Sequence, residues 1–245
     1  ATSTAINFHG QQNIHNGGLA ESTTIDGSAY QFVLSGGIAS DTSINEWGIQ
    51  YISQGGVAND TTINSGGYQR IYFGGVASST TINAVGEQGI RTGGVGISTT
   101  INSGGNQYIS NGGIVRDTTI NGGRQTIISG GVASNTTINS TGLQTISSGG
   151  LAQDTTINEV GSQSVLEGGK ALHTQLDGRG NGEARQNVYG GFVDYTQLGQ
   201  AGFQTLVAAS ADHTTINSGG GQIVGADAVA LNTVINNGGF QYIPA

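Results

Sequence analysis

The sequence predicts an all-β protein, a right-handed parallel β-helix (solenoid) of about thirteen coils of 19 residues. A phrase of the form GGVA-xx-TTIN-xx-GxQxI recurs along nearly the whole chain, usually every 19 residues. A fixed period near 20 is typical of solenoids, in which each repeat buries its apolar edge by stacking on the next. Alternating Thr, Ile, Val and Gln between glycine-rich turns, without a helical period, indicates strands. A right-handed sense is expected because parallel crossover connections overwhelmingly have that hand.

The repeats align on one aliphatic residue that follows the Thr pair. These anchors are Ile6, Ile25, Ile44, Ile63, Ile82, Ile101, Ile120, Ile138, Ile157, Leu176, Leu198, Ile216 and Ile235. Because one kind of repeat fills the chain, we expect residues 1–245 to form a single β-helical domain. We also expect this domain to be a fragment of a longer protein.

Residues 67–85 illustrate one coil in chain order. A first strand ends at Ile71, and residues 73–75 turn the chain at a Gly-Gly pair. A second short strand begins at Val76, and after a corner a third strand ends at the anchor Ile82. Three short strands and three turns per repeat suit one coil of a parallel β-helix, whose coils stack about 4.8 Å apart.

Two polar residues recur in all thirteen repeats. One is a Thr two residues before each anchor, from Thr4 to Thr233, and the other is a Gln, from Gln12 to Gln241. Thr and anchor share one parity along a strand, so we expect both to face inward. The rows are either flat ligand-binding arrays or, as the parity favours, side chains that bond coil to coil as amide ladders do in cross-β assemblies. The residue between Thr and anchor is expected to face water.

The composition excludes several classes of protein. Only 9% of residues are charged, the net charge is -8, and seven basic residues are scattered over 245, so a phosphate-binding surface and nucleic-acid binding are not expected. No apolar run of 18 residues is present, so we expect no membrane insertion by this chain. The chain has no cysteine, which excludes disulfides.

Acidic and histidine residues show no constellation for catalysis or metal binding. A polysaccharide-cleaving β-helix needs two or three neighbouring carboxylates, or a carboxylate-bound metal with a basic residue nearby. Here an acidic cluster would appear as acids at one position of adjacent repeats. Asp41 and Asp60 meet that condition, but Ser79 and Ser98 follow at the same position, which favours a turn role. The four histidines are scattered, and a calcium-binding GGxGxDxUx repeat is not matched. We therefore predict a protein that is not an enzyme and has no metal or cofactor.

One segment breaks the period. Twelve residues separate Thr174 from Gln186, against eight in the standard coil, and the extra residues fall within 177–184. We expect an outward loop at 177–184, because an inward insertion would break the stack. The loop is either a binding loop or simple drift of one repeat.

Units such as GGVASNTTINSTGLQTISSGG, residues 130–150, closely resemble the 19-residue repeats of the AIDA/TibA-type self-associating autotransporter adhesins of Gram-negative bacteria. The resemblance covers almost the whole chain. It implies the N-terminal part of a passenger domain, a right-handed β-helix at the bacterial cell surface or secreted. Export would proceed through a C-terminal outer-membrane barrel that this chain does not contain.

The resemblance also implies a role in virulence: host-cell adhesion, autoaggregation and biofilm formation. Its partners would be copies of itself on neighbouring cells, the host cell surface, and a heptosyltransferase that adds O-linked heptose to Ser or Thr. Small outward Thr residues would let another copy approach, and the candidates for self-association are Thr62, Thr81, Thr100 and Thr119. The glycosylation candidates are serines expected at corners, namely Ser40, Ser65, Ser78, Ser103, Ser134, Ser140 and Ser218.

Two other functions stay open. One is a β-helical polysaccharide-degrading enzyme, which the missing carboxylate cluster disfavours. The other is an ice-binding rod, which would need outward Thr residues spaced as TxT on a flat face. Adjacent Thr residues point to opposite faces of a strand, so the TT pairs of this chain do not meet that need.

Overall fold

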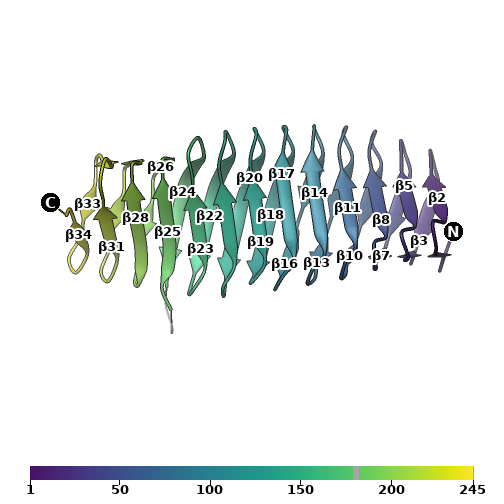
Figure 1. Cartoon of the computed structure of the whole chain (residues 1–245), viewed down its shortest axis with the longest axis horizontal. Coiled ribbons are helices and arrows are strands. Elements are labelled where there is room, and N and C mark those ends of the chain that lie inside the picture. The colour runs from purple at the N-terminus through teal and green to yellow at the C-terminus, as the bar shows by residue number, and fades with distance from the viewer. Residues whose placement is uncertain (179–181, 245) are drawn as a thin grey trace. The chain divides into compact units, whose positions relative to one another are not determined.

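The described chain is built from parallel strands that stack as a β-solenoid. The computed structural model describes residues 1–178 and 182–244, in which strands are the regular elements (Figure 1). Paired strands are offset by one repeat, so that Thr62 lies opposite Thr81. Within these residues no helix is long and apolar enough to cross a membrane. The predicted all-β solenoid is confirmed.

Three kinds of strand alternate within a coil, and we name them GG, Thr and Gln strands after the residues that mark them. The separate GG strands, which follow the Gly-Gly pair or its equivalent, are β3 (Leu19–Glu21), β6 (Ile38–Ser40), β9 (Val57–Asn59), β12 (Val76–Ser78), β15 (Val95–Ile97), β26 (Phe192–Asp194), β29 (Ser210–Asp212) and β32 (Val229–Ala230). The separate Thr strands, which end at or just after the anchor, are β1 (Ala5–Ile6), β4 (Thr24–Ile25), β7 (Ser43–Ile44), β10 (Thr62–Ile63), β13 (Thr81–Ile82), β16 (Thr100–Asn102), β27 (Gln197–Leu198), β30 (Thr215–Ile216) and β33 (Val234–Ile235).

In four coils the GG and Thr strands form one element. These fused strands are β18 (Ile114–Asn121), β20 (Val132–Asn139), β22 (Leu151–Asn158) and β24 (Lys170–Asp177). The Gln strands are β2 (Gln11–Ile14), β5 (Tyr30–Val33), β8 (Ile49–Ile52), β11 (Tyr68–Ile71), β14 (Glu87–Arg91), β17 (Asn106–Ser110), β19 (Arg124–Ile127), β21 (Leu143–Ile146), β23 (Ser162–Val165), β25 (Ala184–Tyr189), β28 (Gly202–Val207), β31 (Gly221–Val224) and β34 (Phe240–Tyr242).

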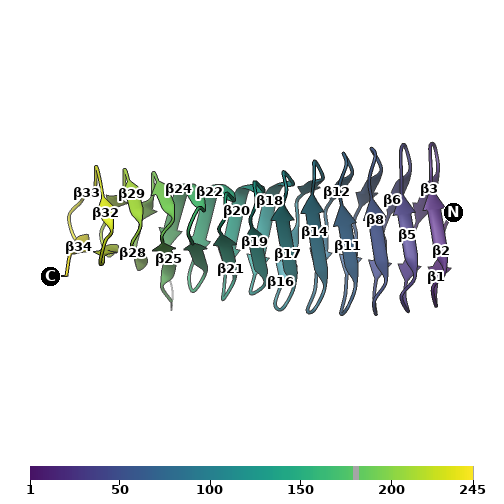
Figure 2. The ribbon, with the colours of Figure 1, turned by 45° about the horizontal axis from the view of Figure 1, so that its top comes forward.

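The chain divides into two compact units. Unit 1 comprises Ala1–Thr119 with Gly123–Gln125, and unit 2 comprises Ile120–Gly122 with Thr126–Ala245. In unit 1 the Gln strands β2, β5, β8, β11, β14 and β17 lie side by side in chain order (Figure 1). In unit 2 the strands β21, β23, β25, β28, β31 and β34 do the same, and Figure 2 shows the labelled strands β21, β25, β28 and β34 in this order. A single domain stays a prediction, as does the loop at 177–184, of which residues 179–181 lie outside the described residues.

Each regular coil turns one Ala, two aliphatic residues, one Thr and one Gln toward the interior. In the coil of Ile82 these are Ala77, Thr80, Ile82, Gln88 and Ile90, none more than 1% exposed. Strand alternation explains the pattern, because every second residue faces the same side. The predicted inward parity of Thr and anchor is confirmed. Each fully buried Ile contributes about 1.5–3 kcal/mol through removal of its surface from water.

The buried Gln side chains form hydrogen-bonded ladders. Each Nε2 donates to Oε1 of the Gln one coil earlier, over 2.7–2.8 Å from Gln31 to Gln125 in unit 1 and 2.5–2.7 Å from Gln163 to Gln241 in unit 2. Several inward Thr hydroxyls add a longer contact, such as Thr80 to Gln69 at 3.3 Å, whereas the buried hydroxyls of Thr23, Thr42, Thr118 and Thr233 have no hydrogen-bond partner within the described part of the chain. Buried amides need such partners. The rows therefore bond coil to coil rather than form a ligand array.

The Gly-Gly turn has two separate steric causes, shown by Gly74 and Gly75. Gly74 has a φ of +78°, a left-handed conformation that L side chains rarely adopt. A Cβ on Gly75 would lie 2.4 Å from the carbonyl oxygen of Ile52 in the preceding coil. The first glycine is therefore required by backbone conformation and the second by the close approach of coils.

The corner between GG and Thr strands is formed by a single exposed residue in left-handed conformation. Asp41, Asp60 and Ser79 hold this position with φ values of 53°, 52° and 53°. Asp and Asn tolerate that region better than most non-glycine residues because their short polar side chains bond locally. These observations support the predicted turn role of Asp41 and Asp60.

Candidate functional site

The outward Thr residues of unit 1 form a continuous column. Thr62 lies opposite Thr81, and Thr81 lies opposite Thr100, in parallel register. Thr119 extends the column, because its amide donates to the carbonyl of Thr99 over 2.8 Å in the same pattern. These four outward side chains are half-buried and uncharged. The structure thus brings together the residues predicted for self-association.

A second column, which the sequence analysis does not foresee, consists of the Asn residues of the TTIN phrase. Their side chains form a ladder in which Nδ2 donates to Oδ1 of the preceding coil, over 2.7 Å from Asn64 to Asn45, 2.8 Å from Asn83 to Asn64 and 2.9 Å from Asn102 to Asn83. The sequence contains the signal for this column, because each Asn lies two residues after an outward Thr or Ser and therefore faces the same side of the strand. We call the outward column Thr62 to Thr119 and the column Asn45 to Asn102 together the polar face of unit 1.

The predicted glycosylation serines fall into two structural classes. Ser65, Ser103, Ser140 and Ser218 lie in the turns that follow the Thr strands, and all four are exposed. A hydroxyl at an exposed turn is open to an enzyme, because connecting turns run over the protein surface.

The expected corner position of Ser40, Ser78 and Ser134 is wrong. These serines lie on β6, β12 and β20 and are half-buried. The corner is formed by the next residue, since that residue adopts the left-handed conformation. The Ser78 hydroxyl also donates to Oδ1 of Asn59 over 2.6 Å.

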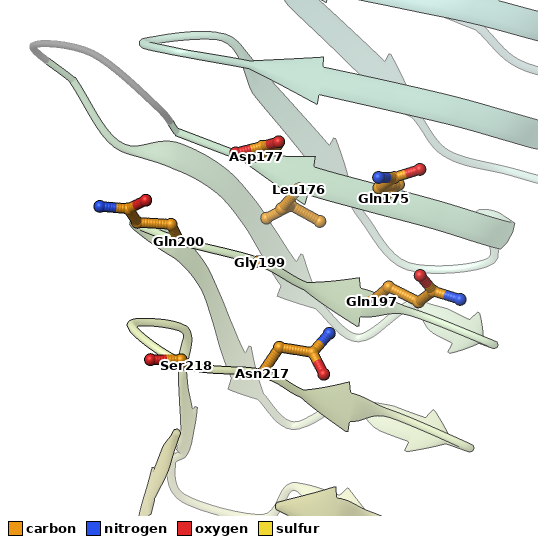
Figure 3. Close-up of a pocket in the computed structure, with 8 residues that line it drawn as sticks. All are labelled: Gln175, Leu176, Asp177, Gln197, Gly199, Gln200, Asn217 and Ser218. Carbon is orange, nitrogen blue, oxygen red and sulfur yellow. The ribbon is translucent and has the colours of Figure 1, made fainter. Parts of the chain in front are cut away.

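Unit 2 has an open pocket on the outer side of its Thr strands and the turns that follow them (Figure 3). Gly199 stands where regular repeats have the ladder Asn, so a side chain is missing from the surface there. Gln175 and Gln197 replace two outward Thr residues and lie opposite each other in register. Amide groups and one carboxylate, Asp177, line the pocket, an arrangement that can hydrogen-bond a polar molecule. Glycoside hydrolysis uses a pair of carboxylates, which this lining does not provide.

Aromatic side chains cluster on the outward side of the Gln strands of unit 1. The rings of Phe32 and Tyr51 stack at 5.1 Å with an interplanar angle of 10°, and Tyr51 meets Tyr72 at 6.2 Å. Burial raises the pKa of Tyr72, the Tyr51 hydroxyl adds to that rise, and the Arg70 guanidinium opposes it. The rings of Phe32 and Tyr51 stack face to face between neighbouring coils. We interpret the cluster as a stabilising ladder.

Three side chains of types that can ligate a metal, which were not predicted to form a group, lie together in unit 2. Asp194 and Asp212 end the GG strands β26 and β29 and are paired in register, and His213 forms the next corner. One ligand atom from each of the three lies within 4.8 Å of the others. The sequence does indicate that Asp194 and Asp212 are neighbours, because they hold the same position in successive repeats.

Comparisons with known proteins identify the family of the chain. A protein-family match covers residues 42–105 and 123–181 and is described as AIDA, adhesin of bacterial autotransporter system, probable stalk. Among solved structures, the chain is similar to the crystal structure of a TibC-catalysed hyper-glycosylated fragment of TibA, with 34% sequence identity and a TM-score of 0.91. That similarity covers 100% of this chain and 96% of the TibA fragment. The comparison with curated proteins gave no match.

The family match covers half of the chain, and the similarity to the TibA fragment extends over all of it with the same solenoid fold. The chain therefore belongs to the AIDA/TibA-type family of bacterial autotransporter adhesins, as part of a passenger.

Proposed function

We propose that this chain is a surface-exposed passenger adhesin that acts by binding and catalyses no reaction. It holds copies of itself on neighbouring bacteria together and attaches to host cells, and so supports autoaggregation and biofilm formation. The observation that carries the proposal is the polar face of unit 1, in which uncharged Thr and Asn side chains stand in register from coil to coil.

The polar face suits contact between copies for two reasons. Its Thr and Asn columns carry no charge, so a second copy meets little like-charge repulsion there. Each intermolecular hydrogen bond contributes only about 0.5–1.5 kcal/mol. A repeated column offers many such bonds at once, and multivalent contact turns weak bonds into strong attachment.

The function as an ice-binding protein is not supported by the coil geometry. Thr80 is buried, and its neighbour Thr81 faces outward. Outward Thr residues of this coil therefore lack the TxT spacing that an ice-binding face would need.

We infer that the passenger is O-heptosylated on Ser or Thr by a heptosyltransferase before export through an outer-membrane barrel. The similar TibA fragment is hyper-glycosylated by TibC, which supports the inference for this relative. The exposed turn serines Ser65, Ser103, Ser140 and Ser218 are the first acceptors to test. Intact mass of the chain, made with and without the transferase, should show increments of one heptose. Identical masses would refute the modification and leave the adhesin proposal standing.

The test of self-association changes the four Thr residues of the polar face together. Thr62, Thr81, Thr100 and Thr119 are replaced by Asp in one variant and by Lys in another, and each passenger is displayed on cells with and without heptose. We expect both variants to lose cell clumping, because charged side chains would have to be dehydrated at the contact. Single substitutions should leave clumping nearly unchanged.

The Lys variant is the matched control for overall charge. The net charge of the parent is -8. Four Asp residues add four negative charges and make it -12, and four Lys residues add four positive charges and make it -4. If clumping followed overall charge alone, the Lys variant would clump better than the parent, and the proposed use of this face would be wrong. If cells displaying the parent passenger neither clump nor adhere to epithelial cells, the adhesin proposal itself fails.

A further inference from the structure

We propose that Asp194, Asp212 and His213 form a binding site for a divalent transition-metal ion, with Zn²⁺ as the best match. Nδ1 of His213 lies 3.1 Å from Oδ1 of Asp194 and 3.3 Å from Oδ1 of Asp212. Zinc holds nitrogen and oxygen ligands at about 2.0–2.2 Å in a tetrahedron, which places the ligand atoms about 3.3–3.5 Å from one another. Without an ion, Nδ1 of His213 and Oδ1 of Asp194 are at hydrogen-bonding distance. One ligand atom of each residue lies within 4.8 Å of the others, so small side-chain rotations would bring the three ligands to zinc spacing.

A cation between the two carboxylates would offset their mutual repulsion. Asp194 and Asp212 are direct neighbours in the parallel register of β26 and β29, where like charges repel. No Lys or Arg within residues 1–178 and 182–244 forms an ion pair with either carboxylate. The imidazole of His213 is the group that faces both of them. A divalent cation would offset two negative charges, whereas a protonated imidazole offsets one.

Neighbouring groups hold the ligands in position. Oδ1 of Asp194 accepts a hydrogen bond from the backbone amide of Tyr195, and Oδ1 of Asp212 accepts one from that of His213, each over 2.9 Å. Nδ2 of Asn232 donates to Oδ1 of Asp212 over 2.8 Å. The Tyr195 ring stacks on that of His213 at 4.7 Å with an interplanar angle of 7°. Such contacts fix ligand orientation in metal sites.

The donor set selects the class of ion. One imidazole with two carboxylates suits Zn²⁺ and its first-row neighbours, whereas Ca²⁺ prefers six to eight oxygen ligands. Three protein ligands leave at least one position of a tetrahedral ion to water or to a group from outside. The His213 side chain is 43% exposed, so such a group can reach the site. The proposal does not depend on the adhesin function.

The test is titration of the purified, folded chain with Zn²⁺ by calorimetry, with Co²⁺ absorption as a second readout of tetrahedral coordination. We expect one site that weakens at least tenfold in His213→Ala and in Asp212→Asn. Because the ligating imidazole must be unprotonated, Zn²⁺ affinity should fall as the pH is lowered. An excess of Ca²⁺ should not displace the ion.

His173→Ala is the matched control. His173 is also a corner histidine of unit 2, but it faces one carboxylate, that of Asp154 at 3.6 Å. This variant should keep the site, and circular dichroism should show all variants equally β-rich. Equal Zn²⁺ binding by the parent and His213→Ala, or no binding by the folded parent at 100-fold excess of metal, would overturn the proposal.

Discussion

At the scale of single residues, the side of the strand decides what a side chain does. Ile82 is fully buried while Thr81, the preceding residue, is half-buried and faces outward. Both positions lie in the strand β13, but the side chain of residue 82 is surrounded by protein and that of residue 81 is in contact with water. They form a natural pair for testing the energetics of the coil.

We predict that Ile82→Asp unfolds the chain at much lower denaturant than Thr81→Asp. A carboxylate at position 82 would be buried among apolar neighbours without a partner, which costs several kcal/mol, whereas position 81 remains in contact with water. Chemical denaturation of the two variants followed by circular dichroism measures the difference. Equal losses of stability would show that the assigned inward and outward positions are incorrect.

Val85 is a strained residue on the surface of unit 1. It has a φ of 63° and is 65% exposed, whereas the same place in the adjacent coils is held by Gly66 and Gly104. The left-handed region is especially unfavourable for a β-branched residue. We predict that Val85→Gly raises the free energy of unfolding by about 1 kcal/mol, because the strain removed exceeds the entropy cost of glycine.

Ala84→Gly is the control for that substitution. Its backbone is not left-handed, so glycine there should lower stability by about 0.5–1 kcal/mol. Denaturant midpoints of both variants decide the question. A fall in stability for Val85→Gly would mean that the exposed Val side chain contributes more than its strained backbone costs.

At the scale of strands and ladders, the repeats are held together by amide rows as well as by aliphatic packing. Gln69 accepts from Nε2 of Gln88 over 2.7 Å and donates to Oε1 of Gln50 over 2.7 Å. Each buried amide therefore depends on both neighbouring coils. A single change in the row affects three coils at once.

We predict that Gln69→Leu destabilises the chain by about 2–5 kcal/mol although leucine is apolar. The substitution removes the oxygen that accepts from Nε2 of Gln88 and the amide that donates to Oε1 of Gln50. Each buried polar group left without a partner costs about 1–3 kcal/mol. The outward neighbour Arg70→Leu serves as control and should change stability less, since its ion pair with Glu87 is partly exposed. A neutral or stabilising effect of Gln69→Leu would show that side-chain hydrogen bonding in the row is dispensable.

The sequence was sufficient for the inward and outward sides of the strands, because the 19-residue period repeats one pattern of strand and turn. It did not predict that the GG and Thr strands form one strand in β18, β20, β22 and β24, where three separate strands per coil were expected. The placement of Thr80 and Ile82 inside and Thr81 outside follows from alternation alone. The position of Ser78 did not follow, since the corner depends on which residue adopts a left-handed φ. The pairing of Asp194 with Asp212 needed the aligned register of two irregular repeats rather than a motif.

At the scale of the whole molecule, charge is the property that composition sets most directly. The chain has 15 acidic and seven basic side chains, a net charge of -8 at pH 7 and an isoelectric point near 4.7. The net charge therefore makes copies of the chain repel one another at long range at neutral pH, although the polar face itself adds no charge to the contact. Any association through the polar face must overcome this repulsion.

We predict that self-association of the purified chain increases as the pH falls from 7 toward 5. Acidification brings the net charge toward zero at the isoelectric point near 4.7, so repulsion between copies is lost while Thr and Asn side chains keep their hydrogen-bonding groups. Added salt at pH 7 should act in the same direction, because it screens repulsion over about 10 Å at 0.1 M. Static light scattering across pH and salt measures both effects. If association instead rested on ion pairs between copies, salt would weaken it, and contact through an uncharged face would be refuted.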